Sequence, residues 1–210
     1  MAYVLGFFSA DGYMTVNRRG GQFWCIQITD GEILRQIKKT IKSDHKISIR
    51  FSKNSNEKDL YRLQIGSIEM CDDLRKLGLG ERKTKNLAIP NVPKKYFLDF
   101  VRGYFDGDGH VWVGYINKKR KTKTLIIQTG FTSCSGDFLE VMRCRLEYFG
   151  INKGVISNRD KNYFRLTYSV AGALNLYKFM YNGSCIKNKL FLNRKKVIFE
   201  NFMKKKKLRL

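Results

Sequence analysis

The sequence contains few of the residues from which metal clusters and covalent frameworks are built. Its five cysteines are an odd number without a C-x-x-C pair, and it has two histidines, His45 and His110. The cysteines therefore argue against a disulfide framework and a zinc knuckle, and the two histidines exclude a histidine-rich metal site. No apolar run approaches the roughly 20 residues of a membrane-spanning helix, and the apolar N-terminus lacks the basic flank of a signal peptide. We expect an intracellular protein, in the cytoplasm, the nucleoid or an organelle, that is not secreted and has no membrane partner.

Acidic residues are also scarce. The 210 residues include 41 Lys and Arg but 18 Asp and Glu, which gives a formal net charge of +23, and both halves of the sequence share the excess. Such a charge is tolerated most easily when the usual partner is a polyanion, and nucleic acid is the common one. An anionic membrane surface fits less well because no long basic amphipathic helix is present. The hydrophobic fraction of 43% is enough for a buried core and excludes wholesale disorder.

A short motif occurs twice in the sequence. Residues 4–12 are VLGFFSADG and residues 101–109 are VRGYFDGDG, both of the form V-x-G-aromatic-Phe-x-small-Asp-Gly. The same order of strand-like and helix-like patterns follows each copy. Helices are predicted at residues 2–10, about 30–41, 68–77, 97–107, 135–146, 171–181 and 193–204, and strands at 13–18, 22–29, 46–51, 61–66, 110–116, 124–132, 154–157 and 163–168.

These patterns predict an α+β fold of two pseudo-symmetric αββαββα repeats, whose antiparallel sheets form a saddle. The first repeat covers residues 1–92, with a linker at about 80–92, and the second covers residues 93–210 and ends in a basic tail. Residues 29–32, Thr-Asp-Gly-Glu, predict a capping box at the start of the second helix. Ser135 opens the equivalent helix of the second repeat.

Small residues recur at helical spacing within each motif. They are Gly6 and Ala10 in the first copy, and Gly103 and Gly107 in the second. Such residues let two helix backbones approach more closely than the usual separation of about 8–10 Å. Packing through these residues is expected to bring Asp11 and Asp108 together at the C-terminal ends of the two helices.

Two carboxylates at one point repel each other unless a cation lies between them. Mg²⁺ takes one or two carboxylates and completes its coordination with waters and phosphate oxygens. We therefore predict a metal site at Asp11 and Asp108, with the backbone carbonyls of Ala10 and Gly107 as further ligands. Such a site can activate water and stabilise the leaving oxygen of a phosphodiester. The alternative is that each Asp-Gly pair is only a turn and each glycine only a packing residue; a calcium loop at 106–109 is disfavoured because position 117 is Asn.

The two motifs, with the elements that follow them, resemble the LAGLIDADG homing endonucleases over nearly the whole chain. The second copy is the closer match. The resemblance implies an intron-encoded monomer with pseudo-two-fold symmetry that hydrolyses both strands of double-stranded DNA at a long target. It also implies Mg²⁺ as cofactor, for which Mn²⁺ or Ca²⁺ can substitute. The target should be asymmetric because the two halves differ, for example at Asn17 and its counterpart Gly114.

Other functions are compatible with the same fold. An RNA-splicing maturase, with the host intron RNA as partner, and a non-cleaving DNA-binding regulator are the alternatives. A structural RNA-binding protein would fit the charge but would leave the paired motif unexplained. The sixth motif position departs from the family pattern, since it is Ser9 in the first copy and Asp106 in the second. In the family this position is structural, so Ser9 bears on the stability of the helix end more than on catalysis.

The family also places one basic and one polar residue per half around the active-site waters. By position, the basic residue of the first half is Lys83, and that of the second half is Lys187 or Lys189, while Lys85 and Arg194 compete on the same argument. Asp30 and Ser135 occupy the polar positions.

Alternation along the predicted strands gives each sheet one polar face. Arg, Gln, Asn, Thr and Ser bond to base edges and phosphates, and a twisted ribbon can enter a major groove. A solvated sheet face explains about half of these positions, but it does not explain why acids are so scarce on them. The predicted DNA-binding residues are Thr15, Asn17, Arg19, Gln27, Thr29, Ser48, Arg50, Arg62 and Gln64 in the first half, and Trp112, Thr124, Gln128, Thr132, Arg165 and Thr167 in the second. Lys118, Lys119, Arg120 and Lys121 form a basic loop expected to contact phosphates, and Lys204–Lys207 form a tail that adds salt-sensitive affinity.

Overall fold

Helices and strands follow one another in the order that the repeat predicts. The computed structural model describes residues 1–54, 56–81, 83–84, 86–117, 119, 121–181 and 190–208. In the first half the elements are α1 (Ala2–Asp11), β1 (Gly12–Val16), β2 (Gln22–Ile28), α2 (Gly31–Thr40), β3 (Ile47–Arg50), β4 (Leu60–Gly66) and α3 (Ile68–Lys76). In the second half they are η1 (Lys94–Tyr96), α4 (Phe97–Asp108), β5 (Gly109–Ile116), β6 (Thr124–Ser133), α5 (Gly136–Tyr148), β7 (Val155–Asp160), β8 (Tyr163–Tyr168), α6 (Val170–Tyr181) and α7 (Asn193–Lys205).

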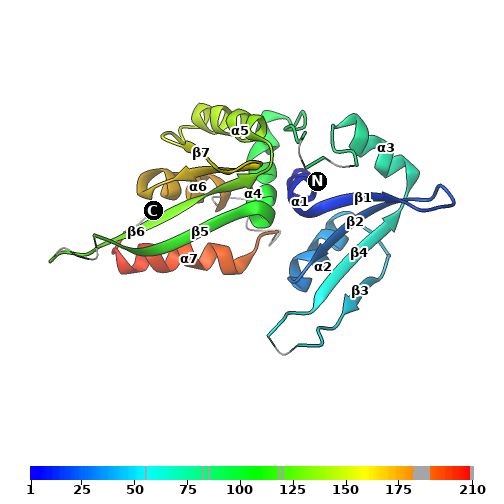
Figure 1. Cartoon of the computed structure of the whole chain (residues 1–210), viewed down its shortest axis with the longest axis horizontal. Coiled ribbons are helices and arrows are strands. Elements are labelled where there is room, and N and C mark those ends of the chain that lie inside the picture. Colours follow the sequence, from blue (N-terminus) through cyan, green and yellow to red (C-terminus); the bar gives the residue numbers. More distant parts are fainter. Residues whose placement is uncertain are drawn as a thin grey trace. The chain divides into compact units, whose positions relative to one another are not determined.

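The fold class is α+β, as predicted, with one four-stranded antiparallel sheet in each half (Figure 1). The strand order is β1-β2-β4-β3 in the first sheet and β5-β6-β8-β7 in the second, so the two sheets share one topology. None of the described helices is long and apolar enough to cross a membrane.

The chain divides into two compact units, Met1–Gly107 and Asp108–Leu210. This division differs from the predicted repeat boundary at residues 92 and 93, because most of α4 packs with the first unit. The predicted linker also packs there, since Leu87 and Val92 are buried. The repeat limits themselves concern the duplicated sequence and stay a prediction.

Each sheet buries one face and leaves the other to polar side chains. In the first unit Trp24, Ile26 and Leu63 are buried on the inner face, where α2 supplies Ile33 and Leu34. In the second unit the buried residues of the sheet are Ile127, Phe131, Leu166 and Tyr168, and the helices contribute Phe138, Leu139, Leu176 and Phe199. Helix α7 runs alongside β5 (Figure 1).

The strand registers confirm the predicted polar faces. In the first sheet Gln27 pairs with Arg62, which pairs in turn with Ser48. In the second sheet Trp112 pairs with Gln128, while Thr132 pairs with Arg165. Residues that pair across an antiparallel ladder point to the same face, so the polar side chains of each sheet lie together, opposite the core.

Helices α1 and α4 touch at their backbones through the predicted glycines. A Cβ placed on Gly6 would lie 2.0 Å from the carbonyl oxygen of Phe100, and a Cβ on Gly103 would lie 2.0 Å from that of Tyr3. The two contacts are reciprocal, because Tyr3 and Phe100 hold equivalent positions in the two motifs. No side chain larger than hydrogen fits at either position, so the small residues of the motif are confirmed as a packing surface.

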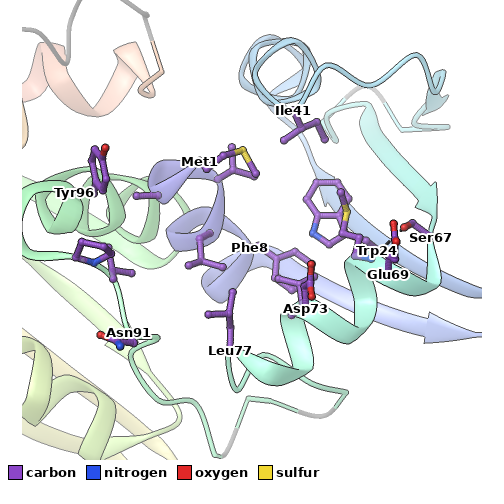
Figure 2. Close-up of a pocket in the computed structure, with 17 residues that line it drawn as sticks. Met1, Phe8, Trp24, Ile41, Ser67, Glu69, Asp73, Leu77, Asn91 and Tyr96 are labelled. Carbon is purple, nitrogen blue, oxygen red and sulfur yellow. Dashed lines mark hydrogen bonds between the residues drawn. The ribbon is translucent and has the colours of Figure 1, made fainter.

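Helix α1 is apolar around its circumference and is buried on most sides. Phe8 stacks on Trp24 of the sheet, with the ring centres 5.5 Å apart and the planes at 10°. Beside this stack lies a largely apolar cavity of about 590 Å³, lined by α1, α3 and the segment that enters η1 (Figure 2). Figure 2 shows Glu69 and Asp73 of α3 among its lining residues. The cavity borders the core side of the first sheet, because Trp24 lines it.

The sixth motif position, where the copies differ, takes part in the contact between α1 and α4. The hydroxyl of Tyr3 donates to Oδ2 of Asp106 at 2.7 Å, and both side chains are buried. The equivalent positions, Phe100 and Ser9, carry neither a hydroxyl on the ring nor a carboxylate. Ser9 instead donates to the carbonyl oxygen of Leu5 in its own helix, at 2.9 Å. The difference between Ser9 and Asp106 is therefore accompanied by a second difference between the copies, since Phe100 stands where the first copy has Tyr3.

The predicted capping box at residues 29–32 is wrong. Helix α2 begins at Gly31 with Asp30 as its N-cap, and Asp30 makes no side-chain capping bond. Because the N-cap falls one residue later than expected, Glu32 is the second helical residue rather than the third, which a capping box requires. Glu32 bonds instead to Arg35, at 3.2 Å, and to Gln36, at 3.3 Å.

Replacement of Gly103 by alanine should destabilise the first unit. The added methyl group must push the α4 backbone away from Tyr3, and overpacking of this kind costs about 1–3 kcal/mol. We expect the free energy of unfolding to fall by about 2–3 kcal/mol in denaturant titrations of Gly103→Ala. Gly80→Ala is the matched control, since its new Cβ meets nothing closer than 4.0 Å. Equal stability of the two variants would show that the helices do not need this close approach.

Candidate functional site

The first motif acid lies at the end of α1, against the last turn of α4. A Cβ placed on Gly107 would lie 2.4 Å from Cβ of Ala10 and 3.1 Å from Oδ2 of Asp11. A side chain at position 107 would therefore collide with the end of α1. Asp108 is the next residue along the chain and the last residue of α4. Each motif aspartate is thus the final residue of its helix.

The helix ends favour a cation at these acids. The C-terminal end of a helix carries a partial negative charge, which basic residues usually offset. Neither α1 nor α4 has a basic residue in its last turn. The carbonyl oxygen of Asp108 accepts a hydrogen bond from Oγ1 of Thr132 at 2.9 Å, which fixes the end of α4 to β6.

The available ligands fit a hard cation. Across the described part of the chain, no three or more His, Cys, Asp or Glu side chains gather as a metal cluster. Asp11 and Asp108 are carboxylates, and the residues before them supply peptide oxygens, which suit hard cations better than zinc, whose usual ligands are nitrogen and sulfur. Mg²⁺ accepts few protein ligands because it retains waters and takes phosphate oxygens from its substrate. The assignment of Asp11, Asp108, Ala10 and Gly107 as ligands stays a prediction.

A buried lysine lies beside the second motif. Lys195 of α7 is 6% exposed, and its ammonium group donates to the carbonyl oxygen of Gly109 at 2.7 Å. Gly109 directly follows Asp108, so a positive charge is held within the second unit next to the motif acid. Burial of an ammonium group is costly unless it is hydrogen-bonded, and this one is.

Sequence reasoning missed Lys195 because it stands in a run of three basic residues, of which Arg194 was the competing candidate. Arg194 is exposed. The signal that could have identified Lys195 is its spacing, since it falls on the apolar side of α7 with Phe199, Phe202 and Met203, all buried. A lysine on the buried face of an amphipathic helix needs a specific partner.

The predicted basic residues have different outcomes. Lys83 is half-buried, and its ammonium group lies 5.6 Å from the ring centre of Phe8 in α1. It therefore stands beside the first motif helix, and its catalytic role stays a prediction. Lys187, Lys189 and Lys85 lie outside the described residues.

The two predicted polar residues lie at helix starts. Ser135 is the N-cap of α5, where its hydroxyl accepts from the backbone N–H of Phe138 at 3.2 Å. Its own N–H donates to Oγ of Ser133 at 3.0 Å, and its side chain is buried. Asp30 holds the N-cap position of α2 and is half-buried. The geometry gives Ser135 a structural task, and a catalytic role for either residue stays a prediction.

The polar face of the first sheet centres on an arginine. Arg62 is half-buried and donates to Sγ of Cys25 at 3.8 Å. Beside it, the hydroxyl of Tyr13 donates to Oε1 of Gln27 at 3.4 Å. Burial raises the pKa of Tyr13, and the nearby Cys25 adds to this effect, so its hydroxyl remains a neutral donor.

Other predicted residues of the first half lie at the margins of this face. Ser48, Arg50 and Arg19 are exposed, and Thr15 and Gln64 are half-buried. Asn17 is part of the turn after β1, because its side-chain oxygen accepts from the backbone N–H groups of Arg19, at 3.0 Å, and Gly21, at 2.8 Å. Thr29 is exposed just past the end of β2.

The polar face of the second sheet is hollowed. A depression of about 580 Å³ is lined by His110, Trp112, Gln128, Lys153, Val155, Ser157, Arg165, Thr167 and Ser169. Trp112 is 47% exposed within this depression. Burial, together with the nearby charges of Arg165 and Lys195, lowers the pKa of His110 to about 4, so the imidazole is neutral at physiological pH.

Five residues of this depression were not predicted: His110, Lys153, Val155, Ser157 and Ser169. His110 lies two positions before Trp112 on β5, so strict alternation could have placed it on the same face. Ser157 could not be placed without the register of β7 on β8, which is interrupted at Asn158 and Asp160. The predicted basic loop is only partly described: Lys119 and Lys121 are exposed, as is Thr124, whereas Lys118 and Arg120 lie outside the described residues.

The family of the chain follows from its sequence. The family model of the LAGLIDADG-like domain matches residues 1–77 and 96–182. The chain belongs to the LAGLIDADG-like domain family. A curated relative, the probable translation initiation factor IF-2 of Thermococcus kodakarensis, is 34% identical over 112 residues, which are 51% of this chain and 8% of that protein. The chain thus spans under a tenth of that relative.

Solved structures show the same fold. The LAGLIDADG meganuclease I-AabMI bound to uncleaved DNA has a TM-score of 0.60 at 15% identity, with 97% of this chain and 91% of that chain covered. I-SmaMI bound to an uncleaved DNA target in the presence of calcium ions has a TM-score of 0.57 at 14% identity, with 95% and 91% covered. The resemblance of the duplicated motif to this family is therefore confirmed at the level of fold as well as sequence.

Removal of the Ser135 hydroxyl should cost about as much stability as removal of any helix cap. Ser67 caps α3 in the same manner, accepting from the N–H of Met70 at 3.1 Å, and provides a matched comparison. We expect Ser135→Ala and Ser67→Ala each to lower the free energy of unfolding by about 1 kcal/mol in denaturant titrations. A negligible effect of Ser135→Ala beside a clear effect of Ser67→Ala would show that Ser135 is not placed there as a cap.

Proposed function

We propose that this protein is a site-specific endonuclease that hydrolyses both strands of double-stranded DNA at a long target, with a divalent metal ion. One observation carries the proposal: each copy of the duplicated motif ends its helix in an aspartate. In the first unit, reciprocal glycine contacts bring Asp11 beside Gly107, the residue before Asp108. A bound metal ion would explain why acids end both motif helices in a chain of charge +23, whereas a protein that needed only the fold would not need them.

Asp11 and Asp108 would hold the metal, with the carbonyl oxygens of Ala10 and Gly107 as further donors. Bound there, Mg²⁺ would supply positive charge for the phosphate under attack and for the leaving oxygen. The protein's own residues would position these ligands. Gly107 leaves room for the Asp11 carboxylate, and Thr132 holds the carbonyl of Asp108 in place.

Two lysines add positive charge near the motif acids. Lys195 is anchored on Gly109, and Lys83 lies over Phe8 of α1. Negative charge develops on the leaving oxygen as its bond to phosphorus breaks, and a fixed ammonium group nearby would stabilise that charge. We propose Lys83 and Lys195 as the basic residues of the two halves.

The protein would bind the DNA as a monomer, through the polar faces of its two sheets. Their arginines, amides and hydroxyls suit base edges, and the lysines of the loop between β5 and β6 suit phosphates. The two faces differ in composition, with Trp112 and Gln128 in one where the other has Thr15 and Phe23. This difference favours an asymmetric target over a palindrome.

The decisive test is cleavage with and without the motif acids. A duplex recovered by selection with the wild-type protein should be cut on both strands in Mg²⁺ and left intact in EDTA. Asp108→Asn should lower the single-turnover rate on the order of a thousandfold, since a lost ligand removes several kcal/mol of stabilisation. Binding of the uncut duplex should persist, because Asn keeps the shape of Asp and removes a negative charge. Equal cutting by both proteins would refute the catalytic assignment.

The role of Lys195 can be separated from its packing. Lys195→Met keeps most of the apolar stem but removes the charge, so cleavage should fall about 10–100-fold, as is typical when a supporting group of a metal site is lost. Lys196→Met is the control, since Lys196 pairs with Glu200 at 2.7 Å on the same helix. Single-turnover rates are to be measured well below the unfolding temperature of each variant. If cleavage by Lys195→Met matches that of the control, Lys195 is structural only.

A further inference from the structure

The two sheets carry the same arrangement around one arginine each. In the first sheet Arg62 of β4 pairs with Ser48 of β3 on one side and Gln27 of β2 on the other. In the second sheet Arg165 of β8 pairs with Ser157 of β7 and Thr132 of β6. Both arginines stand on strands that are flanked on each side by another strand.

Each arginine lies in the row of its sheet that is level with the motif acid. Gly12 pairs with Ile26, so Gln27, the partner of Arg62, comes next to the position of Asp11. Gly109 pairs with Phe131, and the hydroxyl of Thr132 reaches the carbonyl of Asp108 at 2.9 Å. Both arginines therefore lie at the end of the polar face that is nearest to the acid of their own unit.

Both guanidinium groups are positioned but not neutralised. The Nε atom of each is buried and, within the described part of the chain, has no hydrogen-bond partner. The outer nitrogens make only weak contacts, from Arg62 to Sγ of Cys25 at 3.8 Å and from Arg165 to the hydroxyl of Tyr163 at 3.4 Å. No carboxylate of the described residues forms an ion pair with either. A charged group that is held without an ion pair and with weakly bonded outer nitrogens is costly, so these outer nitrogens are available to a partner that arrives from outside.

We propose that Arg62 and Arg165 each recognise a guanine, at equivalent positions nearest the centre of the two half-sites. This inference rests on the proposed function and names part of its substrate. Arginine bonds the O6 and N7 atoms of guanine in the major groove with two parallel hydrogen bonds. A phosphate would accept the same pair of bonds. The inner strands and the neutral neighbours Ser48, Gln27, Ser157 and Thr132 favour a base edge, whereas the phosphate-binding lysines lie in loops.

We therefore expect a target whose innermost contacted base pairs are symmetric and whose outer base pairs are asymmetric. The innermost contacted pair of each half-site should be G·C, with the guanines related by the two-fold axis of the site. The next rows differ between the sheets, with Gln64 and Cys25 in one, and Thr167 and Gly130 in the other. Those rows should select different bases in the two half-sites.

The test is selection of bound duplexes from a randomised library by the full-length protein, with Ca²⁺ present. Because it scores binding, it does not depend on cleavage. The wild-type protein should select guanine at one position in each half-site, at equal distances from the centre. Arg165→Lys should lose about tenfold or more of the preference at one of these positions, and Arg62→Lys at the other, since lysine keeps the charge but not the paired bonds.

Lys121→Ala serves as the matched control for a phosphate contact. It should weaken binding to all sequences alike and make the salt dependence shallower, with the guanine preference intact. If Arg62→Lys and Arg165→Lys behave as this control does, the arginines bind phosphate and the inference is wrong. It is equally wrong if they retain the base preference and lose only cleavage.

The wild-type selection alone decides the matter if either variant fails to fold, because the absence of symmetric guanines among bound sequences overturns the proposal. Failure of the proposed function would give a different result in the same binding selection. In that case the wild-type protein would show no sequence preference at all, or would bind the library no better than unrelated single-stranded RNA.

Discussion

The structure depends on the close approach of two helix backbones at Gly6 and Gly103. Everything near the motif follows from this contact: the carbonyl oxygens of Tyr3 and Phe100 occupy the space where a side chain would stand. The same approach brings the end of α1 against Gly107, and so sets the place of the Asp11 carboxylate. A helix pair with ordinary side chains between its members would separate these ends by several ångströms.

Positive and negative charges have different places in this protein. Positive charge is spread over the sheets, loops and tail, where a polyanion can neutralise it. The motif acids end helices that have no basic residue in their last turns, although Lys195 of α7 binds the carbonyl oxygen of Gly109, next to Asp108. A cation held by these acids would be compatible with both features, since its charge would offset the repulsion between the acids and the phosphates of the proposed substrate.

The duplicated motif is the reason that so much of the fold could be predicted. Two copies of one pattern give two independent estimates of each element, and the polar faces followed from strand alternation. The capping box at residues 29–32 was wrong because one residue of shift at a helix start changes which side chain can reach the backbone. Lys195 was missed because its neighbours in the chain are also basic, and only the buried face of α7 distinguishes it. The place of Ser157 depends on a long-range register with an irregularity, which no local pattern encodes.

The bond between Tyr3 and Asp106 has a consequence for how such a chain can evolve. A protein made of two copies of the first motif would set Tyr3 against Ser9, and one made of two copies of the second would bury two carboxylates opposite phenylalanine. The former loses a hydrogen bond and the latter leaves acids without donors. The two halves have therefore become complementary parts, and neither can replace the other without repair of this polar pair.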